Sequence, residues 1–318
     1  MSAPTTNRPG GKPRVGVVIP VYNRRTVLLE TLPFVLHQSL PPDVLAIADD
    51  GSNDGTADAA EQWLASERRP FEWHVLKLPH RTAADARASG YDALGETDYV
   101  AFLDSDDHWP ADFLARGVAA LEACPEAVAA SADGRYTDTL GLAPELSDRS
   151  PLATDPIGWM LRYGAGIASC SLLRSAAHEV AGGWEHRGDR AEDTNLFCTM
   201  ATLGPWLHLP GEPVDYYLGN AVVRGEADNL SRRDSCMSFR WARVYESIVD
   251  RIGNDDRASV RAAMARIWRN AGRELEDRGH VQAARGCYTR SLRWQRVQYN
   301  ATRRLLKSYF ETPAKEAA

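Results

Sequence analysis

Several features that would mark a specialised class of protein are missing from the sequence. No apolar run approaches the roughly 20 residues that a membrane-spanning helix needs. The opening stretch, MSAPTTNRPGGKPR, has no apolar core, so we expect residues 1–13 to be a disordered lead-in and not a signal peptide. The formal net charge of −6 gives no general attraction to nucleic acid, whose binding proteins are usually basic. These absences predict a cytoplasmic protein without a nucleic-acid partner.

Metal-binding cysteine pairs and nucleotide-binding glycine motifs are missing as well. The five cysteines include no C-x-x-C pair and have no histidine at zinc spacing. They are typical of free thiols in a reducing compartment and comprise Cys124, Cys170, Cys198, Cys236 and Cys287. Neither G-x-G-x-x-G nor G-x-x-x-x-G-K-S/T occurs, which argues against a dinucleotide-binding fold and against a P-loop.

Apolar runs of strand length alternate with helical patterns through the first third of the chain. Pro33 falls inside the first helical pattern and predicts a kink or a break there. Strands that alternate with helices are typical of an α/β fold with a mostly parallel central sheet flanked by helices. In such sheets ligands bind at the carboxyl ends of the strands. The predicted strands cover 14–20, 44–48, 71–78 and 99–103, and the predicted helices cover 24–37, 56–66 and 83–94.

The rest of the chain is less regular at first and then helical. Glu192 is expected to begin a short helix. The segment 157–184 mixes glycine with apolar residues and supports no single assignment. From about residue 234 onward the pattern predicts helices only, and two of them meet at Gly279. The remaining expectations are a helix over 112–121, a strand over 127–131, a loop-like region over 136–156, and C-terminal helices over 257–278 and 280–296.

The most informative stretch is the end of the fourth predicted strand. An apolar run closes in three carboxylates within four residues, at Asp104, Asp106 and Asp107. Like charges so close together repel, and each is costly to bury unless it is paired. A divalent cation resolves this conflict, and carboxylate oxygens together with substrate phosphate suit Mg²⁺ or Mn²⁺. A helix N-cap is the simpler alternative, but one Asp would be enough for it.

Acidic residues also follow the second predicted strand, in the run IADDGSNDGT. The spacing resembles an EF-hand calcium loop, but the segment before it is a strand pattern and is too short for the entering helix. We therefore expect a turn that leads from a strand into a helix, with Asp54 as a cap. At the same sheet edge, Tyr22 is placed to stack on a nucleotide base and Asp50 to accept a base N–H. The alternative is that Tyr22 only fills the sheet edge.

Four motifs resemble, in this order, those of the family 2 glycosyltransferases, which have the GT-A fold: VVIPVYNR, IADDGSNDGT, ADARASG and YVAFLDSDDHWPADFL. An ordered set of four motifs is far more specific than any one of them. The resemblance covers about residues 14–232 and implies a nucleotide-binding half over about 14–110 and an acceptor half over about 111–232. The helical region 233–318 is then a C-terminal extension.

The resemblance implies transfer of a sugar, with inversion, from a nucleoside-diphosphate sugar such as a UDP- or dTDP-sugar to an acceptor hydroxyl. In the D-x-D motif, Asp106 is then the main ligand of Mg²⁺ or Mn²⁺ and Asp104 contacts the metal or the ribose. Asp50 accepts a base N–H, and Arg87 lies near the base and the phosphates. The full set of positions that match the donor site is Pro20, Val21, Tyr22, Asp50, Arg87, Asp104 and Ser105.

Single displacement also needs a base that takes the proton of the acceptor hydroxyl. The candidate is Asp193, with Glu192 before it, because GGW…EDTNL is similar to the family's G-G-F/W…E-D-x-x-L arrangement. Both acids fall in the first turn of a predicted helix, where the helix dipole favours the ionised form. The alternative is that Asp193 only caps this helix.

Some positions near the expected site depart from the family pattern or lack a firm role. Ala88 stands where A-R-N-x-G has asparagine, and 219–224 lacks a histidine that some relatives carry before the N-x-S element at 229–231. His108 and His208 are better explained as strand-end or surface residues. Candidates for a sugar or acceptor contact are Asp107, Trp109 and Trp184.

The C-terminal helices combine basic and apolar side chains. Arginine and lysine recur between Arg290 and Lys307 beside leucine, tryptophan and phenylalanine. This pattern is typical of a peripheral contact with the inner face of a membrane. Packing against the catalytic domain or against a second subunit in a homodimer explains it equally well.

Two other functions compete with sugar transfer. A sugar-phosphate nucleotidyltransferase has a related sheet, but it needs a glycine-rich phosphate loop after the first strand, and PVYNRRT lacks the glycines. A catalytically inactive GT-A scaffold would have no need of Asp104, Asp106 and Asp193, all of which are present.

Overall fold

Strands and helices alternate through the first hundred residues, as predicted. The computed structural model describes residues 11–67, 71–138, 145–184, 192–218, 237–252, 258–296 and 299–310. Its first elements are β1 (Val15–Val21), α1 (Arg25–Leu36), β2 (Val44–Asp49), α2 (Thr56–Ser66), β3 (Glu72–Lys77), α3 (Ala83–Ala93) and β4 (Tyr99–Phe102). A strand, β2, enters the EF-hand-like run, which confirms that this run is not an EF-hand.

Helix α1 continues through Pro33 to Leu36, so the prediction of a break there is wrong. The proline lies in the last turn, where few following residues depend on its missing hydrogen bond. Its carbonyl still accepts a hydrogen bond from the His37 amide at 2.9 Å. The buried face of the helix explains why the last turn holds, and it consists of Val27, Leu28, Thr31, Leu32, Val35 and Leu36.

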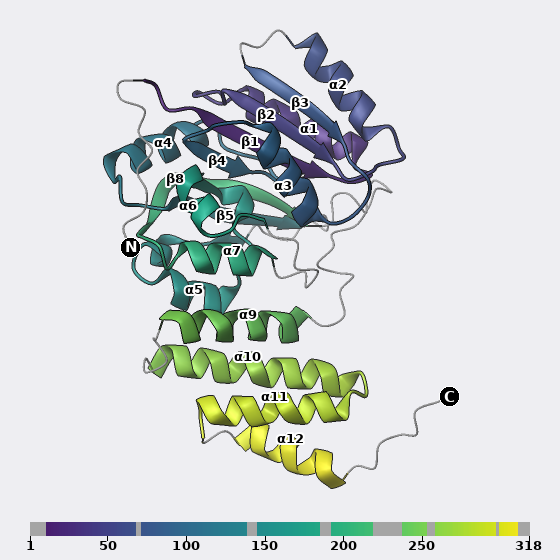
Figure 1. The fold of residues 1–318 in the computed structure, drawn as a ribbon, viewed down its shortest axis with the longest axis vertical. Coiled ribbons are helices and arrows are strands. Elements are labelled where there is room, and N and C mark those ends of the chain that lie inside the picture. Colours follow the sequence, from purple (N-terminus) through teal and green to yellow (C-terminus); the bar gives the residue numbers. More distant parts are fainter. Residues whose placement is uncertain are drawn as a thin grey trace. The chain divides into compact units, whose positions relative to one another are not determined.

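The described strands form one sheet in the order β3-β2-β1-β4-β7-β5-β6, with β8 paired to β5. β1 pairs in parallel with both β2 and β4, and β2 with β3, which confirms the mostly parallel sheet. Tyr91 of α3 packs near Phe102, with 6.5 Å between ring centroids. Helix α4 (Phe113–Ala123) covers the opposite face, where its Gly117 lies against Leu172. Helices therefore flank both faces of the sheet (Figure 1).

The central part of the chain is more ordered than the sequence indicates. β5 (Ala129–Asp138) extends past the predicted strand into the first residues of the predicted loop, and β8 (Trp206–Leu218) was not predicted at all. The two strands pair in parallel, with an irregularity between Ala132 and Gly134. Arg135 of β5 and Asp215 of β8 form a cross-strand ion pair at 2.5 Å. The other elements of this region are β6 (Glu145–Ser147), the 3₁₀ turns Ser150–Ala153 and Ala168–Cys170, β7 (Ser171–Arg174) and α6 (Ser175–Val180).

Two compact units are present, and the sheet with its flanking helices makes up the first. The second unit contains most of α5 (Pro156–Tyr163), most of α7 (Glu192–Met200) and the C-terminal helices. The C-terminal helices are α9 (Met237–Ile252), α10 (Ala258–Asp277), α11 (Val281–Trp294) and α12 (Tyr299–Phe310).

The C-terminal helices follow the prediction closely. Each packs against the next in chain order, and Gly279 separates α10 from α11 with a φ of 81° (Figure 1). Glycine suits this position because other residues rarely adopt a positive φ. Tyr245 of α9 also donates a hydrogen bond to the carbonyl of Met160 in α5 at 2.7 Å. None of the described helices combines the length and apolar character that a bilayer-spanning segment requires.

Candidate active site

The sheet brings the predicted nucleotide-binding motifs to one edge. β1 lies between β2 and β4 and runs in the same direction as both. The pairing continues past the strand ends, because Asp50 donates its amide to the Val21 carbonyl at 2.9 Å and Leu103 donates to Val18 at 2.9 Å. The carboxyl ends of parallel strands are where ligands bind in such sheets. The Tyr22, Asp50 and Asp104 motifs therefore follow three adjacent strand ends.

Asp104 is the most open of the three clustered carboxylates, with 41% of its side chain exposed. Its Oδ1 lies 2.6 Å from Nη2 of Arg87, an ion pair that fixes the direction of the carboxylate. Its backbone amide donates to the hydroxyl of Ser169 at 3.1 Å. Ser169 was not predicted, because it lies 65 residues away in the chain.

Asp106 and Asp107 are almost fully buried, at 5% exposure each. Asp106 forms an ion pair with Arg24, whose Nη1 lies 3.0 Å from Oδ1. Burial nevertheless raises the pKa of Asp106 to about 6, and the neighbouring Asp104 charge adds to this effect. Burial, followed by the charges of Asp106 and Asp104, also raises the pKa of Asp107 well above its usual range. A cation placed beside these carboxylates would offset their negative charge.

Arg24 is a site residue that the sequence analysis missed. Its guanidinium contacts Oδ1 of Asp106 at 3.0 Å and the Ser105 hydroxyl at 3.3 Å. The carbonyl of Ser105 accepts a hydrogen bond from the hydroxyl of Thr31 at 2.8 Å. The start of α1 therefore fixes the D-x-D segment, and the available signal was the position of Arg24 as the last residue of the VVIPVYNR motif.

Asp50 lies at the end of β2 with both carboxylate oxygens engaged. Oδ1 accepts the Arg81 amide at 2.7 Å, and Oδ2 lies 2.9 Å from Nδ1 of His80. Burial raises the pKa of Asp50 despite these contacts. Tyr22 stacks on the His80 ring, with 4.1 Å between the centroids. His80 therefore joins the two residues that were predicted to meet a base, a link that the sequence did not reveal.

Gly51 permits this arrangement. It has a φ of +77°, and a Cβ there would lie 2.7 Å from the amide nitrogen of His80. Any other residue would push the turn after β2 away from the segment after β3. Pro20 and Val21 are buried in β1 beside this turn.

Trp109 and Trp184 are buried, at 2% and 4% exposure. The indole nitrogen of Trp109 donates to the Ser169 carbonyl at 2.5 Å, and the ring packs on Phe113. The ring of Trp184 lies 4.7 Å from the Arg87 guanidinium carbon. These are contacts of core side chains, and each tryptophan supports a residue that touches Asp104.

Glu192 and Asp193 begin α7, as predicted, and both residues belong to the second unit and not to the unit that contains the sheet. Oδ1 of Asp193 accepts the amide of Thr194 at 2.6 Å and lies 3.3 Å from its hydroxyl. Glu192 and Asp193 are half-buried and are the acidic residues of the first turn. The N-x-S element at 229–231 lies outside the described residues.

The comparisons with known proteins agree with these motifs. The family model described as Glycosyl transferase family 2 matches residues 16–180, just over half of the chain, and the chain belongs to this family. TuaG of Bacillus subtilis is 39% identical over 103 residues, which cover 32% of this chain and 40% of TuaG. The amylovoran biosynthesis glycosyltransferase AmsB of Erwinia amylovora is 36% identical over 108 residues, or 33% and 35% of the two chains. The chain thus matches well under half of these relatives' length.

Solved structures share the fold over most of the chain. TarS residues 1–349 of S. aureus, crystallised with UDP-GlcNAc, superpose with a TM-score of 0.65 at 14% identity, covering 93% of this chain and 89% of TarS. The mannosyltransferase PcManGT of Pyrobaculum calidifontis, with GDP-Man and Mn²⁺, gives a TM-score of 0.54 at 18% identity, covering 95% and 88%. At these identities the likeness establishes the fold alone, and it confirms the predicted GT-A architecture.

Proposed function

We propose that the protein is an inverting, metal-dependent glycosyltransferase that moves a sugar from a UDP- or dTDP-sugar to an acceptor hydroxyl by single displacement. The observation that carries the proposal is the group of three carboxylates after β4, with Asp104 open and Asp106 and Asp107 buried. Membership of glycosyl transferase family 2 supports it. Two proteins of this fold also bind nucleoside-diphosphate sugars: TarS binds UDP-GlcNAc, and PcManGT binds GDP-Man with Mn²⁺.

Asp106, together with Asp104, is the proposed ligand pair for Mg²⁺ or Mn²⁺. A bound cation of this kind offsets the negative charge that develops on the departing diphosphate. Arg87 holds Asp104 in place at 2.6 Å, and Arg24 does the same for Asp106 at 3.0 Å. Both arginines also add positive charge where the diphosphate is expected.

The donor base is proposed to lie over Pro20, Val21 and Tyr22, with Asp50 accepting its N–H. Tyr22 already stacks on His80, and His80 contacts Asp50. Because the His80 side chain is 55% exposed, it is free to move when a base forms its own bond to Asp50. Ser105 completes the donor site through its place between the two aspartates.

In the proposed reaction, the bond between the anomeric carbon and the diphosphate oxygen breaks as the acceptor oxygen forms its bond to that carbon. The acceptor proton passes to Asp193, with Glu192 beside it. The amide and hydroxyl of Thr194 orient the Asp193 carboxylate. The N-terminus of α7 favours its ionised form, which is the form that acts as a base.

Asp107, Trp109 and Trp184 receive supporting roles in this proposal. Trp109 fixes Ser169 at 2.5 Å, and the Ser169 hydroxyl bonds both the Asp104 amide and the Asp107 carboxyl. Trp184 lies against Arg87. All three side chains therefore help to hold the donor-site residues in place.

A cationic recess in the second unit suggests a partner for the C-terminal helices. It has a volume of about 380 Å³. Glu276, the one acid among the described residues that line it, is paired with Arg304 at 2.5 Å. Its lining comprises Arg269, Arg273, Glu276, Asn300, Arg303, Arg304 and Lys307. An anionic membrane surface suits this charge, whereas a second copy of the chain would have to supply matching acids. Sedimentation with anionic vesicles and light scattering of the free protein distinguish the two partners.

A panel of nucleotide sugars tests the donor class. With Mn²⁺ present, a UDP- or dTDP-sugar should raise the melting temperature by a few degrees through ligand linkage. It should also yield free nucleoside diphosphate when an acceptor is supplied. The proposal fails if no nucleoside-diphosphate sugar shifts the melting temperature.

A further inference from the structure

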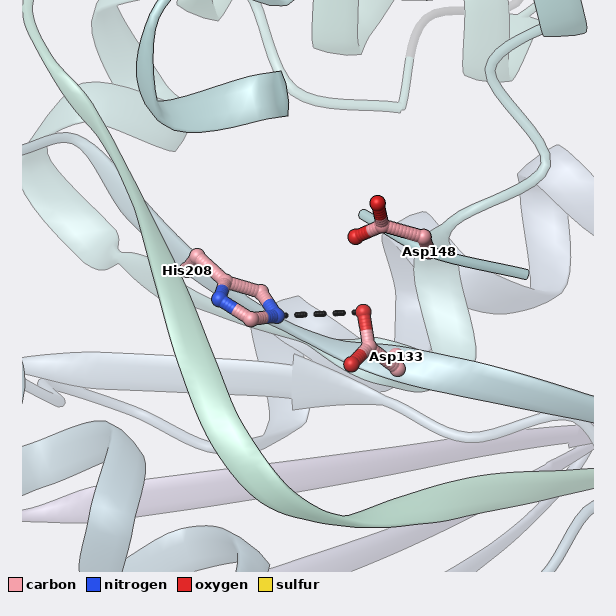
Figure 2. A group of neighbouring side chains, drawn as sticks. All are labelled: Asp133, Asp148 and His208. Atoms are coloured by element: carbon pink, nitrogen blue, oxygen red, sulfur yellow. Dashed lines mark hydrogen bonds and ion pairs between the residues drawn. The ribbon is translucent and has the colours of Figure 1, made fainter. Parts of the chain in front are cut away.

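A second group of metal-ligand side chains lies on the far part of the same sheet. Asp133 comes from β5, His208 from β8, and Asp148 from the segment between β6 and the following 3₁₀ turn. Nε2 of His208 lies 3.0 Å from Oδ1 of Asp133, and one ligand atom from each of the three residues lies within 4.8 Å of the others. Figure 2 shows both carboxylates turned toward the imidazole.

Backbone amides hold the two carboxylates in this position. The Arg149 amide donates to Oδ1 of Asp133 at 2.7 Å, and the Ser150 amide donates to Oδ1 of Asp148 at 2.8 Å. The amides orient the carboxylates without neutralising their charge.

Arg149 follows Asp148 directly in the sequence, but its side chain makes its contacts with other groups. The Arg149 side chain is fully buried and donates to the Ala132 carbonyl at 3.3 Å and the Tyr136 hydroxyl at 3.4 Å. Its guanidinium carbon lies 5.1 Å from the Tyr216 ring centroid, and its nitrogens lie against Gly134. Among the described residues, the imidazole of His208 is thus the basic group that lies beside the two aspartates.

We propose that Asp133, Asp148 and His208 form a metal site for Zn²⁺ that is separate from the D-x-D motif. One imidazole and two carboxylates form a ligand set that suits zinc, whereas Mg²⁺ prefers oxygen ligands alone. Neighbouring ligand atoms around a four-coordinate zinc lie roughly 3.3 Å apart, given bonds of about 2.0–2.1 Å, and the 3.0 Å between His208 and Asp133 is close to this spacing.

Asp148 is exposed, so a rotation of its side chain can bring its carboxylate closer to His208 and Asp133. Three protein ligands leave a fourth position for water or for an oxygen of a bound molecule. None of the three residues belongs to the proposed donor or base positions, so the site does not depend on the proposed reaction.

The test is a calorimetric titration of Zn²⁺ into the metal-free full chain, without nucleotide and with excess Mg²⁺. We expect a site whose affinity falls at least about tenfold in His208→Gln and in Asp133→Asn. His74→Gln is the matched control, because His74 contacts a single carboxylate, Glu72, at 3.2 Å. This control should bind Zn²⁺ as the wild type does.

Each possible result of the titrations either supports or overturns the proposed zinc site. An unchanged titration in His208→Gln, an equal loss in His74→Gln, or no Zn²⁺ binding by the wild type would each overturn the proposal. Histidine-ring NMR of the wild type gives a second measurement that requires no variant to fold. Addition of Zn²⁺ should shift the His208 ring signals and leave those of His74 in place; the opposite pattern would contradict the assignment.

Discussion

Arg24 and Asp106 form an ion pair with 3.0 Å between Nη1 and Oδ1, and both side chains are largely buried, at 11% and 7% exposed. In this pair, the start of α1 meets the segment after β4. The pair compensates only part of the negative charge, because the pKa of Asp106 is still raised to about 6 and that of Asp107 is raised as well. The remaining charge is the basis for the proposed metal site.

Asp106→Asn should remove metal-dependent binding of the nucleotide. The substitution keeps the shape of the side chain but removes a charged ligand, so we expect UDP affinity in the presence of Mn²⁺ to fall about 100-fold or more, beyond the 10–100-fold typical of outer-shell changes. Asp112→Asn is the control, since Asp112 is an exposed carboxylate paired with Arg116 at 3.0 Å. Calorimetry measures both variants. Wild-type affinity in Asp106→Asn would remove Asp106 from the proposed ligands.

Arg87 should contribute geometry as well as charge. It lies 2.6 Å from Asp104 and under the Trp184 ring, an arrangement that a lysine cannot reproduce. We expect Arg87→Lys to raise the donor KM about tenfold, which matches the loss of one charge-assisted hydrogen bond. Arg14→Ala, which breaks an exposed pair with Glu72, should leave the KM unchanged. Equal effects of the two substitutions would indicate a loss of stability and not of donor positioning.

Asp193→Asn separates proton transfer from donor binding. Asparagine retains an oxygen that can accept the Thr194 amide, so the start of α7 is preserved. We expect kcat to fall about 10²- to 10⁴-fold while the donor KM stays near the wild-type value. Steady-state kinetics with a donor and acceptor pair checks this. Near-normal turnover would reject Asp193 as the base.

His178 should make the folded state sensitive to acid. It is 2% exposed, and burial lowers its pKa to about 4 from 6.5. Between these values the unfolded chain takes up a proton that the folded protein does not, so stability falls as the pH decreases from 6.5 toward 4. The loss attributable to this group is about 3 kcal/mol.

Urea unfolding across this pH range measures the effect. His178→Phe cannot titrate and retains an aromatic ring beside Tyr91 and Phe102. The variant should therefore show a shallower loss of stability between pH 6.5 and 4. The comparison is between the slopes of unfolding free energy against pH in the wild type and the variant. A change in stability that is the same at every pH therefore does not affect it. Equal slopes would show that His178 is not the responsible group.

The sequence was sufficient to predict where the strands of the nucleotide-binding half end. β1, β2 and β4 are short apolar runs followed at once by polar motifs, and such local patterns need no knowledge of the fold. Parallel pairing then places Tyr22, Asp50 and Asp104 at one edge. The contacts that fix those residues could not be predicted from the sequence, because the partners lie far apart in the chain. Arg24 is 81 residues from Ser105, and Ser169 is 65 residues from Asp104.

Two kinds of position are hard to assign from the sequence alone, for physical reasons. A tryptophan near a motif fits a sugar platform and a core position equally well, and only burial shows that Trp109 and Trp184 are core side chains. β8 escaped prediction because Pro210, Gly211 and Pro213 interrupt its alternation, and it is held by its long pairing with β5. His208 lies on this strand, so its contact with Asp133 could not be foreseen either.

Calorimetric titration of UDP into the wild-type protein, with and without Mn²⁺, tests the central claim most directly. If the carboxylates after β4 hold a metal that bridges to the diphosphate, binding should be at least about tenfold tighter with Mn²⁺ present, a difference of about 1.4 kcal/mol. Equal affinity in the two titrations, or no binding in either, would contradict the proposed metal–diphosphate site.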